Sequence, residues 1–390
     1  MANNTSDTLS AVNDVARRFL IGTVVVAAAL TLVGLTLLWP SDQALPSLTA
    51  LGVTSEVYEA EVFDSYIDPC AGTDPEAGIN CYKVGFELRE GPDAGDLIVL
   101  DFPFLVSSPS FDAGDRVVMN RIPEAAPGFE YQYADRQRRS LLGLIAVGFA
   151  LAVIALGRFK GVAALAGLAA SVAVLLLFIV PSLLENNPPV TVAVVGSAAI
   201  AFVALYTAHG FNQPTSVALL GTLAALVLTA GLSAAAVAAA ELTGFTSEES
   251  LLLTLLPGRI DARGLILAGI VLGSLGALDD VTVTQVSAVT EIRKADPALP
   301  RQALLRAGLR VGRDHIASTV NTLFLAYAGA SMPLLVLFAL SNQSLGTIAN
   351  SEVVATEIIR TLLGSIGLVA AVPITTWLAT MLKPSEVEAG

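Results

Sequence analysis

Two adjacent carboxylates, Asp279 and Asp280, interrupt a long apolar stretch that begins at Gly264. At about 1.5 Å of helical rise per residue, Asp280 lies roughly 20 Å along that stretch, within a hydrocarbon core about 30 Å thick. A carboxylate at that depth is costly unless it meets water, a proton, a cation or a basic partner. The pair therefore predicts an intramembrane site for a cation or a proton. The plainer alternative is a charge pair at the cytoplasmic end of a helix that stops early.

Polar residues continue along one helical face beside the pair. The face consists of Gly273, Gly276, Asp280, Thr284, Ser287 and Glu291. Asp279 points about 100° away, towards Thr282. The β-branched run from Val281 to Thr284 weakens a helix and predicts a locally unwound segment, as in transporters with discontinuous helices.

These residues define a predicted ion or solute site, completed by a residue of the following span. Its members are Asp279, Asp280, Thr282, Thr284, Gln285, Ser287, Glu291 and Asn321. Hydrogen bonding between helices explains the uncharged members equally well. For Glu291, the plainer alternative is an ion pair with Arg293, Lys294 or a basic residue of the next segment. The sequence identifies no metal for the site.

A basic segment follows, and Pro300 suits the first turn of a helix within it. Its bases are Arg293, Lys294, Arg301, Arg306, Arg310 and Arg313. We predict an interfacial helix over 297–313 that lies on the inner leaflet and binds anionic lipid.

The junction of that helix with the next span is a candidate gate. There, Arg313, Asp314 and His315 are predicted to reach Asp280 and Glu291 as gate or counter-ion groups. His209, in the loop HGFNQPT, is a further candidate proton carrier, although a histidine at a helix end is more often a cap or surface residue.

Composition places these groups in a membrane protein. Of 390 residues, 54% are hydrophobic and 14% are charged, and long apolar runs recur along the chain. We predict about eight transmembrane helices, one within residues 1–40 as an uncleaved anchor and the others within 139–390. The basic loops all fall on one side, which predicts that both termini lie in the cytoplasm.

Residues 41–138 differ in character, with 18 acidic and 7 basic side chains in 41–140, a net charge of −11 out of −13 for the chain. Alternating segments such as EVYEAEVFDSYI and CYKVGFELRE, separated by turn sequences, predict an extracytoplasmic all-β domain, an OB-like barrel or sandwich. The acidity argues against nucleic acid as a partner and favours a solvated surface over a metal trap. Cys70 and Cys81 predict a disulfide, with two free thiols as the alternative.

Four motifs carry a resemblance to a known family: GRFKGVAALAGL, HGFNQPTSVALLGT, LGSLGALDDVTVTQVSAVTEI and RDHIASTVNTLFLAYAGASMPLL. With these, the chain resembles the YibE/F-like family of bacterial membrane proteins, and Asp280 fits the acid of the third motif. The resemblance implies a permease-like, multi-pass inner-membrane protein and supplies no substrate.

We therefore predict a secondary transporter or channel for a small ion or ionic solute, proton- or cation-coupled through an intramembrane aspartate. Asp280 is the aspartate expected to bind the coupling ion or proton. No nucleotide-binding motif is present, and no cofactor is expected. The alternative is a membrane-anchored sensor or assembly scaffold acting through the β domain. No enzymatic activity is predicted, since neither histidine has an evident nucleophile partner. A homo-oligomer is left open.

Overall fold

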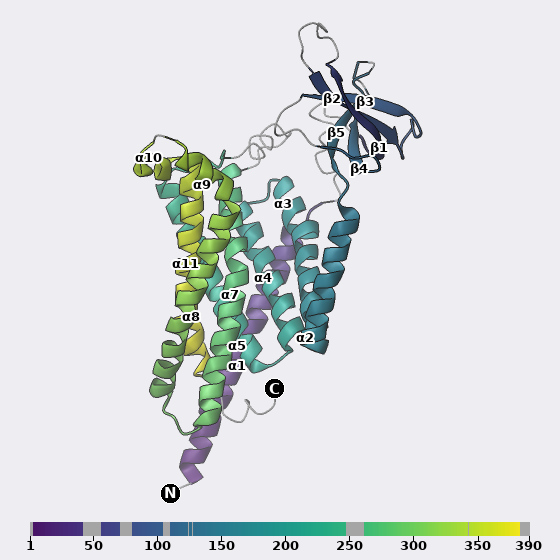
Figure 1. Ribbon diagram of the computed structural model, residues 1–390. Helices are drawn as coiled ribbons and strands as arrows, with labels where there is room; N and C mark the ends of the chain where they lie inside the picture. Colours follow the sequence, from purple (N-terminus) through teal and green to yellow (C-terminus); the bar gives the residue numbers. More distant parts are fainter. Residues whose placement is uncertain are drawn as a thin grey trace. The chain divides into compact units, whose positions relative to one another are not determined.

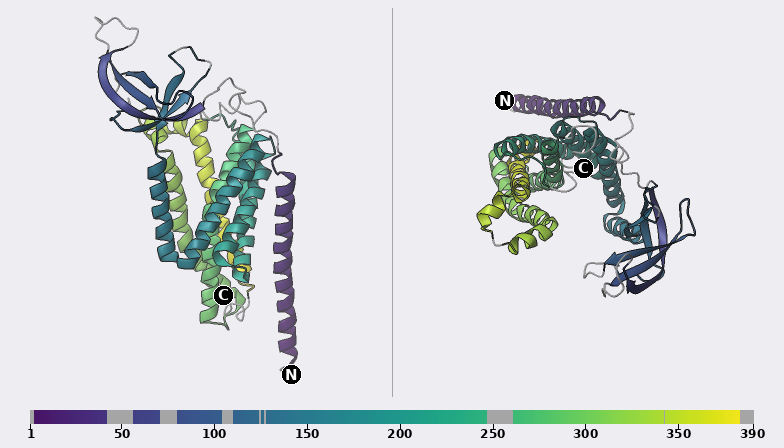
Figure 2. Two further views of the ribbon diagram at one scale, coloured as in Figure 1. Left: turned by 90° about the vertical axis from the view of Figure 1, so that its right-hand side faces the viewer. Right: turned by 90° about the horizontal axis from the view of Figure 1, so that it is seen from above.

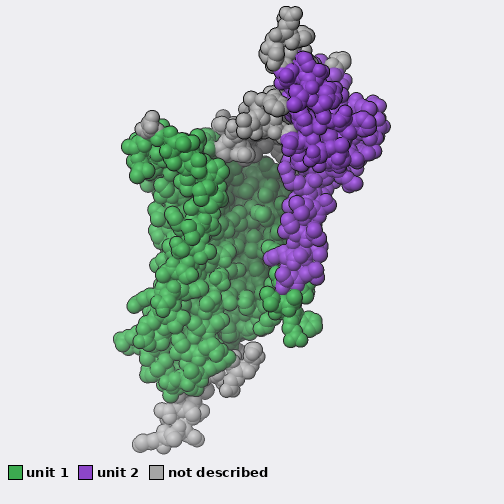
Figure 3. All heavy atoms as spheres, viewed as in Figure 1, with its two compact units in different colours: residues 1–45, 153–390 green, residues 46–152 purple. Residues whose placement is uncertain are grey.

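A computed structural model describes residues 3–41, 56–70, 80–103, 110–123, 125–126, 128–246, 261–341 and 343–382 (Figure 1). The chain forms two compact units (Figure 3). One comprises residues 1–45 and 153–390 and is helical, and the other comprises residues 46–152 and holds the strands.

The strand unit is a curled antiparallel sheet (Figure 2). Its strands are β1 (Glu56–Pro69), β2 (Asn80–Leu88), β3 (Leu97–Pro103), β4 (Arg116–Arg121) and β5 (Tyr131–Arg136), in the order β3-β2-β1-β4-β5. The long strand β1 pairs with both β2 and β4. Its register shifts between Val62 and Asp64, and such a bulge bends and twists a strand. The predicted all-β architecture of this region is confirmed at this level.

Aromatic rings fill the inside of the curled sheet. Phe111 packs against Phe86 of β2, Phe102 of β3 and Tyr133 of β5, with ring centroids 5.6, 5.3 and 5.1 Å apart. Phe102 and Tyr133 also contact each other directly, at 5.8 Å. Because β3 and β5 are the two outer strands in the sheet order, these contacts join the ends of the sheet through the core.

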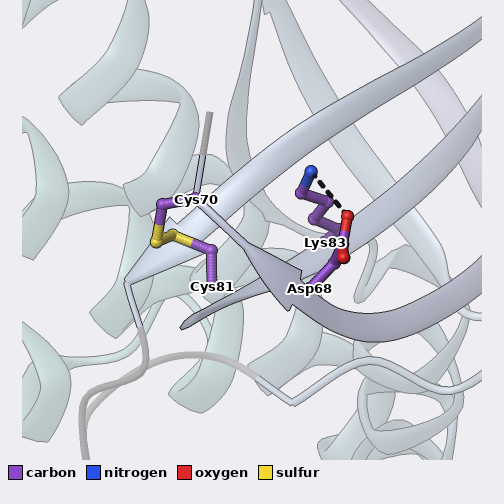
Figure 4. Close-up of a disulfide and its surroundings, with 4 residues drawn as sticks. All are labelled: Asp68, Cys70, Cys81 and Lys83. Atoms are coloured by element: carbon purple, nitrogen blue, oxygen red, sulfur yellow. Dashed lines mark ion pairs between the residues drawn. A yellow bond between two sulfur atoms is a disulfide. The ribbon is translucent and has the colours of Figure 1, made fainter. Parts of the chain in front are cut away.

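The predicted disulfide between Cys70 and Cys81 is confirmed (Figure 4). The bond ties the residue after β1 to the second residue of β2, at a Cα–Cα separation of 4.8 Å. Beside it, the Lys83 ammonium pairs with the Asp68 carboxylate at 3.1 Å, which raises the pKa of the lysine. The bond therefore fixes the β1–β2 hairpin where its connection begins.

Removing this bond should destabilise the strand unit. For a closed loop of about this length the loss is about 3 kcal/mol. We expect the Cys70→Ala/Cys81→Ala variant of the full chain to unfold its strand unit at lower urea concentration, measured by pulse proteolysis. Reductant should lower the midpoint of the parent and leave that of the variant unchanged. Equal midpoints for the variant and the oxidised parent would contradict a stabilising bond.

The helical unit, together with the first part of α2, supplies the candidate membrane spans. Its elements are α1 (Asn3–Leu37), α2 (Arg139–Val174), the π-helix η3 (Leu175–Ile179), α3 (Val180–Leu184), α4 (Pro189–His209), α5 (Gln213–Ala239), α7 (Ala262–Ala295), α8 (Arg301–Ala330), α9 (Met332–Ala339), α10 (Leu345–Asn350) and α11 (Glu352–Ala379). Among described residues, six helical stretches are long and apolar enough to cross a membrane, or seven if α8 and α9, bent by 70°, form one span. The prediction of a mostly helical chain with several helices long and apolar enough to span a membrane is confirmed, whereas the predicted number of eight is not reached by this count.

The largest counted stretch has an internal break. It runs over 46 residues, from Arg139 to Leu184, which is more than twice the roughly 20 residues that one span needs. At Arg158 the backbone has φ 52° and ψ −129°, which is not helical. Nearby, Gly161 faces the carbonyl oxygen of Val153 so closely that a Cβ would collide with it. The chain therefore changes direction tightly at this point.

Helices α5, α7 and α11 pack against one another and bury the core of the helical unit, with α4 and α8 beside them. Glycines allow the closest approaches: Gly221 faces Thr375, and Gly367 faces Thr229. Small residues have this role in membrane bundles, where close backbone contact replaces the hydrophobic effect.

The predicted unwinding after the aspartates is wrong, since α7 is helical from Ala262 to Ala295 without a break. Val281 and Thr282 are fully buried, and the Thr282 hydroxyl lies 2.7 Å from that of Thr222 on α5. Packing against the neighbouring helix thus outweighs the weak helix propensity of β-branched residues.

The predicted separate helix over 297–313 is also corrected. Helix α8 runs unbroken from Arg301 to Ala330, so no junction falls at Arg313. Its first half buries Leu304, Gly308 and Gly312, and the two glycines lie against side chains of α7 and α11. The segment therefore packs into the bundle along one face.

Candidate functional site

Asp279 lies with two hydroxyl groups between α7 and α5. The Thr222 Oγ1 lies 3.5 Å from the Asp279 carboxylate and 2.7 Å from the Thr282 Oγ1. Both threonines are fully buried. At about 1.5 Å per residue, Asp279 stands about 26 Å along the 34-residue helix α7, near its midpoint.

Both hydroxyl protons near this carboxylate have competing acceptors. Thr222 can donate to the Ala218 carbonyl at 3.1 Å or to Thr282, and Thr282 can donate to the Asp279 backbone carbonyl at 3.1 Å. The contact from Thr222 to the carboxylate is the longest of these. Among the described residues Asp279 forms no ion pair. The site is therefore an acceptor-rich group of oxygens with few protons, which suits a proton or a small cation.

Asp280 has a different environment. Its side chain lies at the surface of the single chain. It is on the helix face that also carries Gly276, Thr284, Ser287 and Glu291, as their spacing predicts. The buried residues Leu278, Val281 and Gln285 lie on the other side of the helix. No ion pair to Asp280 is found in the part of the chain that the structure describes. The adjacent aspartates thus occupy separate surfaces, and Asp279, rather than the predicted Asp280, is the one that joins the interior.

Gln285, predicted as a ligand, instead connects three helices. Its side chain is buried, and its Nε2 donates to the Gly308 carbonyl of α8 at 2.9 Å and to the Thr376 hydroxyl of α11 at 2.7 Å. A Cβ at Gly312 would lie 2.9 Å from its Oε1, so this glycine makes room for the amide. These contacts support the alternative of hydrogen bonding between helices.

The predicted gate is not assembled. Glu291 pairs with Lys294 at 2.9 Å, which agrees with the plainer alternative. Arg313 and Asp314 are exposed, and His315 is half-buried with an Nε2 that has no hydrogen-bond partner among described residues. Within that part of the chain no hydrogen bond or ion pair joins them to Asp280 or Glu291. Lipid binding by the basic segment stays a prediction.

Three other predicted residues are exposed. Thr284 and Ser287 lie on the outer face of α7, and Asn321 lies on that of α8. The His209 side chain is also exposed, and its carbonyl accepts a hydrogen bond from the Asn212 amide at 2.7 Å. Asn212 in turn caps α5 by accepting from the Thr215 backbone N–H at 2.8 Å. His209 thus belongs to a helix cap, as its plainer interpretation has it.

Sequence reasoning missed Thr222, which supplies the hydroxyl nearest to Asp279. A signal was present, because Thr215, Thr222 and Thr229 recur every seven residues in an otherwise apolar helix. That spacing places them on one side of a helix, and all three are buried. Among described residues no group of three or more histidine, cysteine or acidic side chains is arranged to hold a metal ion.

These features define a multi-pass helical membrane protein that carries a small antiparallel β unit. The family described as YibE/F-like protein matches residues 145–385, more than half of the chain. The chain belongs to the YibE/F-like family, which confirms the resemblance drawn from its motifs. No curated protein and no solved structure matches the chain.

A structural role for Gln285 predicts a loss of stability. Gln285→Leu keeps the volume and removes both donors, and hydrogen bonds between membrane helices contribute about 1 kcal/mol. We expect a lower melting temperature of the purified protein in detergent. The matched control is Thr207→Ala on the exposed side of α4, which should melt like the parent. An unchanged melting temperature for Gln285→Leu would contradict a stabilising role of the hydrogen bonds that Gln285 forms between helices.

Proposed function

We propose that the protein is a secondary transporter or channel for a small ion or ionic solute, coupled to a proton or cation that binds at Asp279. The observation that carries this proposal is the carboxylate near the midpoint of α7, with two threonine hydroxyls beside it and no basic partner among described residues. A carboxylate that stays charged and unpaired in such a place is costly. Binding of a proton or a cation removes that cost, so the unpaired charge favours binding.

Oxygen donors make this site suitable for hard, weakly polarisable cations. The carboxylate of Asp279 and the hydroxyls of Thr222 and Thr282 offer oxygen ligands, and proton binding would neutralise the same carboxylate. The donors come from α5 and α7, so a relative movement of these two helices would change the number of oxygens around the ion. Such a change is the minimum that alternating access requires.

For topology we propose eight spans, with both termini in the cytoplasm and the strand unit outside the bacterial inner membrane. The break at Arg158 would divide the 46-residue stretch into two spans, and the α8–α9 pair would form one bent span. Arg158 and Lys160 would then lie in a basic inner turn, in agreement with the positive-inside rule.

For the strand unit we propose a partly open barrel of the OB type. The sheet order β3-β2-β1-β4-β5 and the ring contacts between Phe102 and Tyr133 support this architecture. The unit also favours a second candidate function, a sensor or assembly scaffold, because Phe63, Tyr66 and Ile67 are exposed beside the β1 bulge. Under that candidate, deletion of residues 41–138 would abolish function and Asp279→Asn would not.

Transport through Asp279 is tested by flux in proteoliposomes. We expect Asp279→Asn to lower proton-coupled flux by at least about tenfold, because the amide cannot take up a proton or balance a cation. The probe is an internal pH dye, with imposed gradients of sodium, potassium and protons in turn. Asp280→Asn is the matched comparison and should retain more flux, since its side chain lies outside the hydroxyl cluster. Equal flux in Asp279→Asn and the parent would end the proposal.

The proposed turn at Arg158 is tested by thiol labelling. The native cysteines form a disulfide, so single introduced cysteines can be read clearly. We expect a membrane-impermeant maleimide to label Ser344→Cys in spheroplasts, and Lys160→Cys only after lysis. Labelling of Lys160→Cys in intact spheroplasts would contradict an inner turn and the eight-span topology.

A further inference from the structure

Helix α7 exposes a polar face at depths where lipid tails are expected. We define the α7 polar face as Gly276, Asp280, Thr284, Ser287 and Glu291, all exposed on the chain. Among described residues, no atom lies within 4 Å of a Cβ added at Gly276, so the backbone there is open to close approach. Several of these groups can donate or accept hydrogen bonds, and one is a carboxylate near mid-helix.

Helix α8 exposes a second face with matching spacing. We define the α8 basic face as Arg306, Arg310, Arg313, Ala317 and Asn321, also exposed. In the part of the chain that the structure describes, none of the three arginines forms an ion pair. The opposite side of α8, with Leu304, Gly308 and Gly312, is buried in the bundle. The basic face therefore points away from the protein's own core.

Contacts between α7 and α8 place the two faces at equal depth. The helices run antiparallel: Gly273 lies against the Tyr327 hydroxyl, and Val289 and Gln285 lie against Gly308. Counting along both helices from these contacts brings residues of the two faces level, pair by pair. The pairs are Gly276 with Asn321, Asp280 with Ala317, Thr284 with Arg313, Ser287 with Arg310, and Glu291 with Arg306.

We propose that a second copy of this chain covers both faces, related by a two-fold axis along the membrane normal. Such an axis preserves depth, so the α7 polar face of each copy meets the α8 basic face of the other at the same level. Glu291, which pairs with Lys294 of its own chain, then also meets the second copy's Arg306. Asp280 lies about one turn, roughly 5 Å, from the level of the second copy's Arg313, within reach of an extended arginine side chain.

Charge complementarity favours this occupant over lipid. Anionic lipid would neutralise the α8 basic face but would repel Asp280 and Glu291 on the neighbouring α7 polar face. A second copy offers arginines to the acids and acids to the arginines in one isologous interface. It also covers the open backbone at Gly276, and small residues at such contacts allow membrane helices to pack closely. The inference does not depend on the transported species or the coupling ion.

Charge reversal in separate copies tests the pairing of Glu291 with Arg306. In Glu291→Arg alone and in Arg306→Glu alone, both contacts across the axis join like charges, so the dimer of each variant should weaken. When the two variants are co-expressed with different tags, both contacts of the mixed dimer join opposite charges. We expect the mixed dimer to exceed each homodimer by about tenfold, since two repulsive pairs become attractive. The readouts are two-tag purification and native mass spectrometry.

The outcomes separate the alternatives. A monomeric parent, including a monomer that carries anionic lipid, would overturn the proposal. So would mixed dimers no more abundant than the homodimers. If the Glu291→Arg/Arg306→Glu double variant behaves like the parent while the co-expressed single variants do not associate, the pair lies within one chain and the proposal fails. Melting temperatures of both variants check that each copy is folded.

Cross-linking supplies a second measurement that does not alter charge. We expect Gly276→Cys in one copy and Asn321→Cys in another to be joined by a short bismaleimide. Val227→Cys, on an exposed apolar side of α5, is the control and should not cross-link to either. Absence of a Gly276–Asn321 product, with both thiols shown to react with a monofunctional maleimide, would overturn the proposed register.

Discussion

The cost of leaving a polar group unpaired among apolar helices governs the arrangement around α7. The interior side of this helix meets the constraint with short contacts across helices: Thr282 to Thr222 on α5, and Gln285 to Gly308 on α8 and Thr376 on α11. These contacts replace the hydrophobic driving force that a soluble bundle would have. Asp279 stands among them with the weakest of these contacts, and this difference makes it the candidate for exchange.

Threonine side chains pack against glycines of neighbouring helices, which allows the helices to approach closely. Thr229 and Thr376 donate to carbonyls of their own helices, at 2.8 and 2.6 Å, so neither hydroxyl is left unpaired. Their side chains can then lie against Gly367 and Gly308 at close range. These hydroxyl protons are therefore not donated to a carboxylate. Among the described residues, Thr222 supplies the only side-chain hydrogen bond to the Asp279 carboxylate.

Sequence patterns predicted the features that depend on periodicity and local spacing. The alternating segments of β1 to β4, the Cys70–Cys81 bond, the apolar spans and the shared face of Asp280 with Thr284 and Glu291 are of this kind. Contacts between distant segments could not be read in this way. Thr222 lies in a different helix from Asp279, and hydropathy does not reveal which side of a membrane helix faces protein. For the same reason, the sequence predicted an interfacial helix at Leu304, Gly308 and Gly312. In the structure these residues face other helices.

Adjacent residues on a helix point about 100° apart, so two neighbouring aspartates cannot serve one pocket as equals. Under the two proposals, this geometry gives the aspartates of α7 different tasks. Asp279 faces hydroxyls inside the bundle, where a charge can be exchanged with a proton or an ion. Asp280 faces outwards on a stripe whose depth matches the arginines of α8, where a charge can specify a neighbour. Because both tasks lie on one rigid helix, a shift of α7 that alters the oxygens around Asp279 would also move the outer stripe, and assembly and transport would then be coupled through a single element.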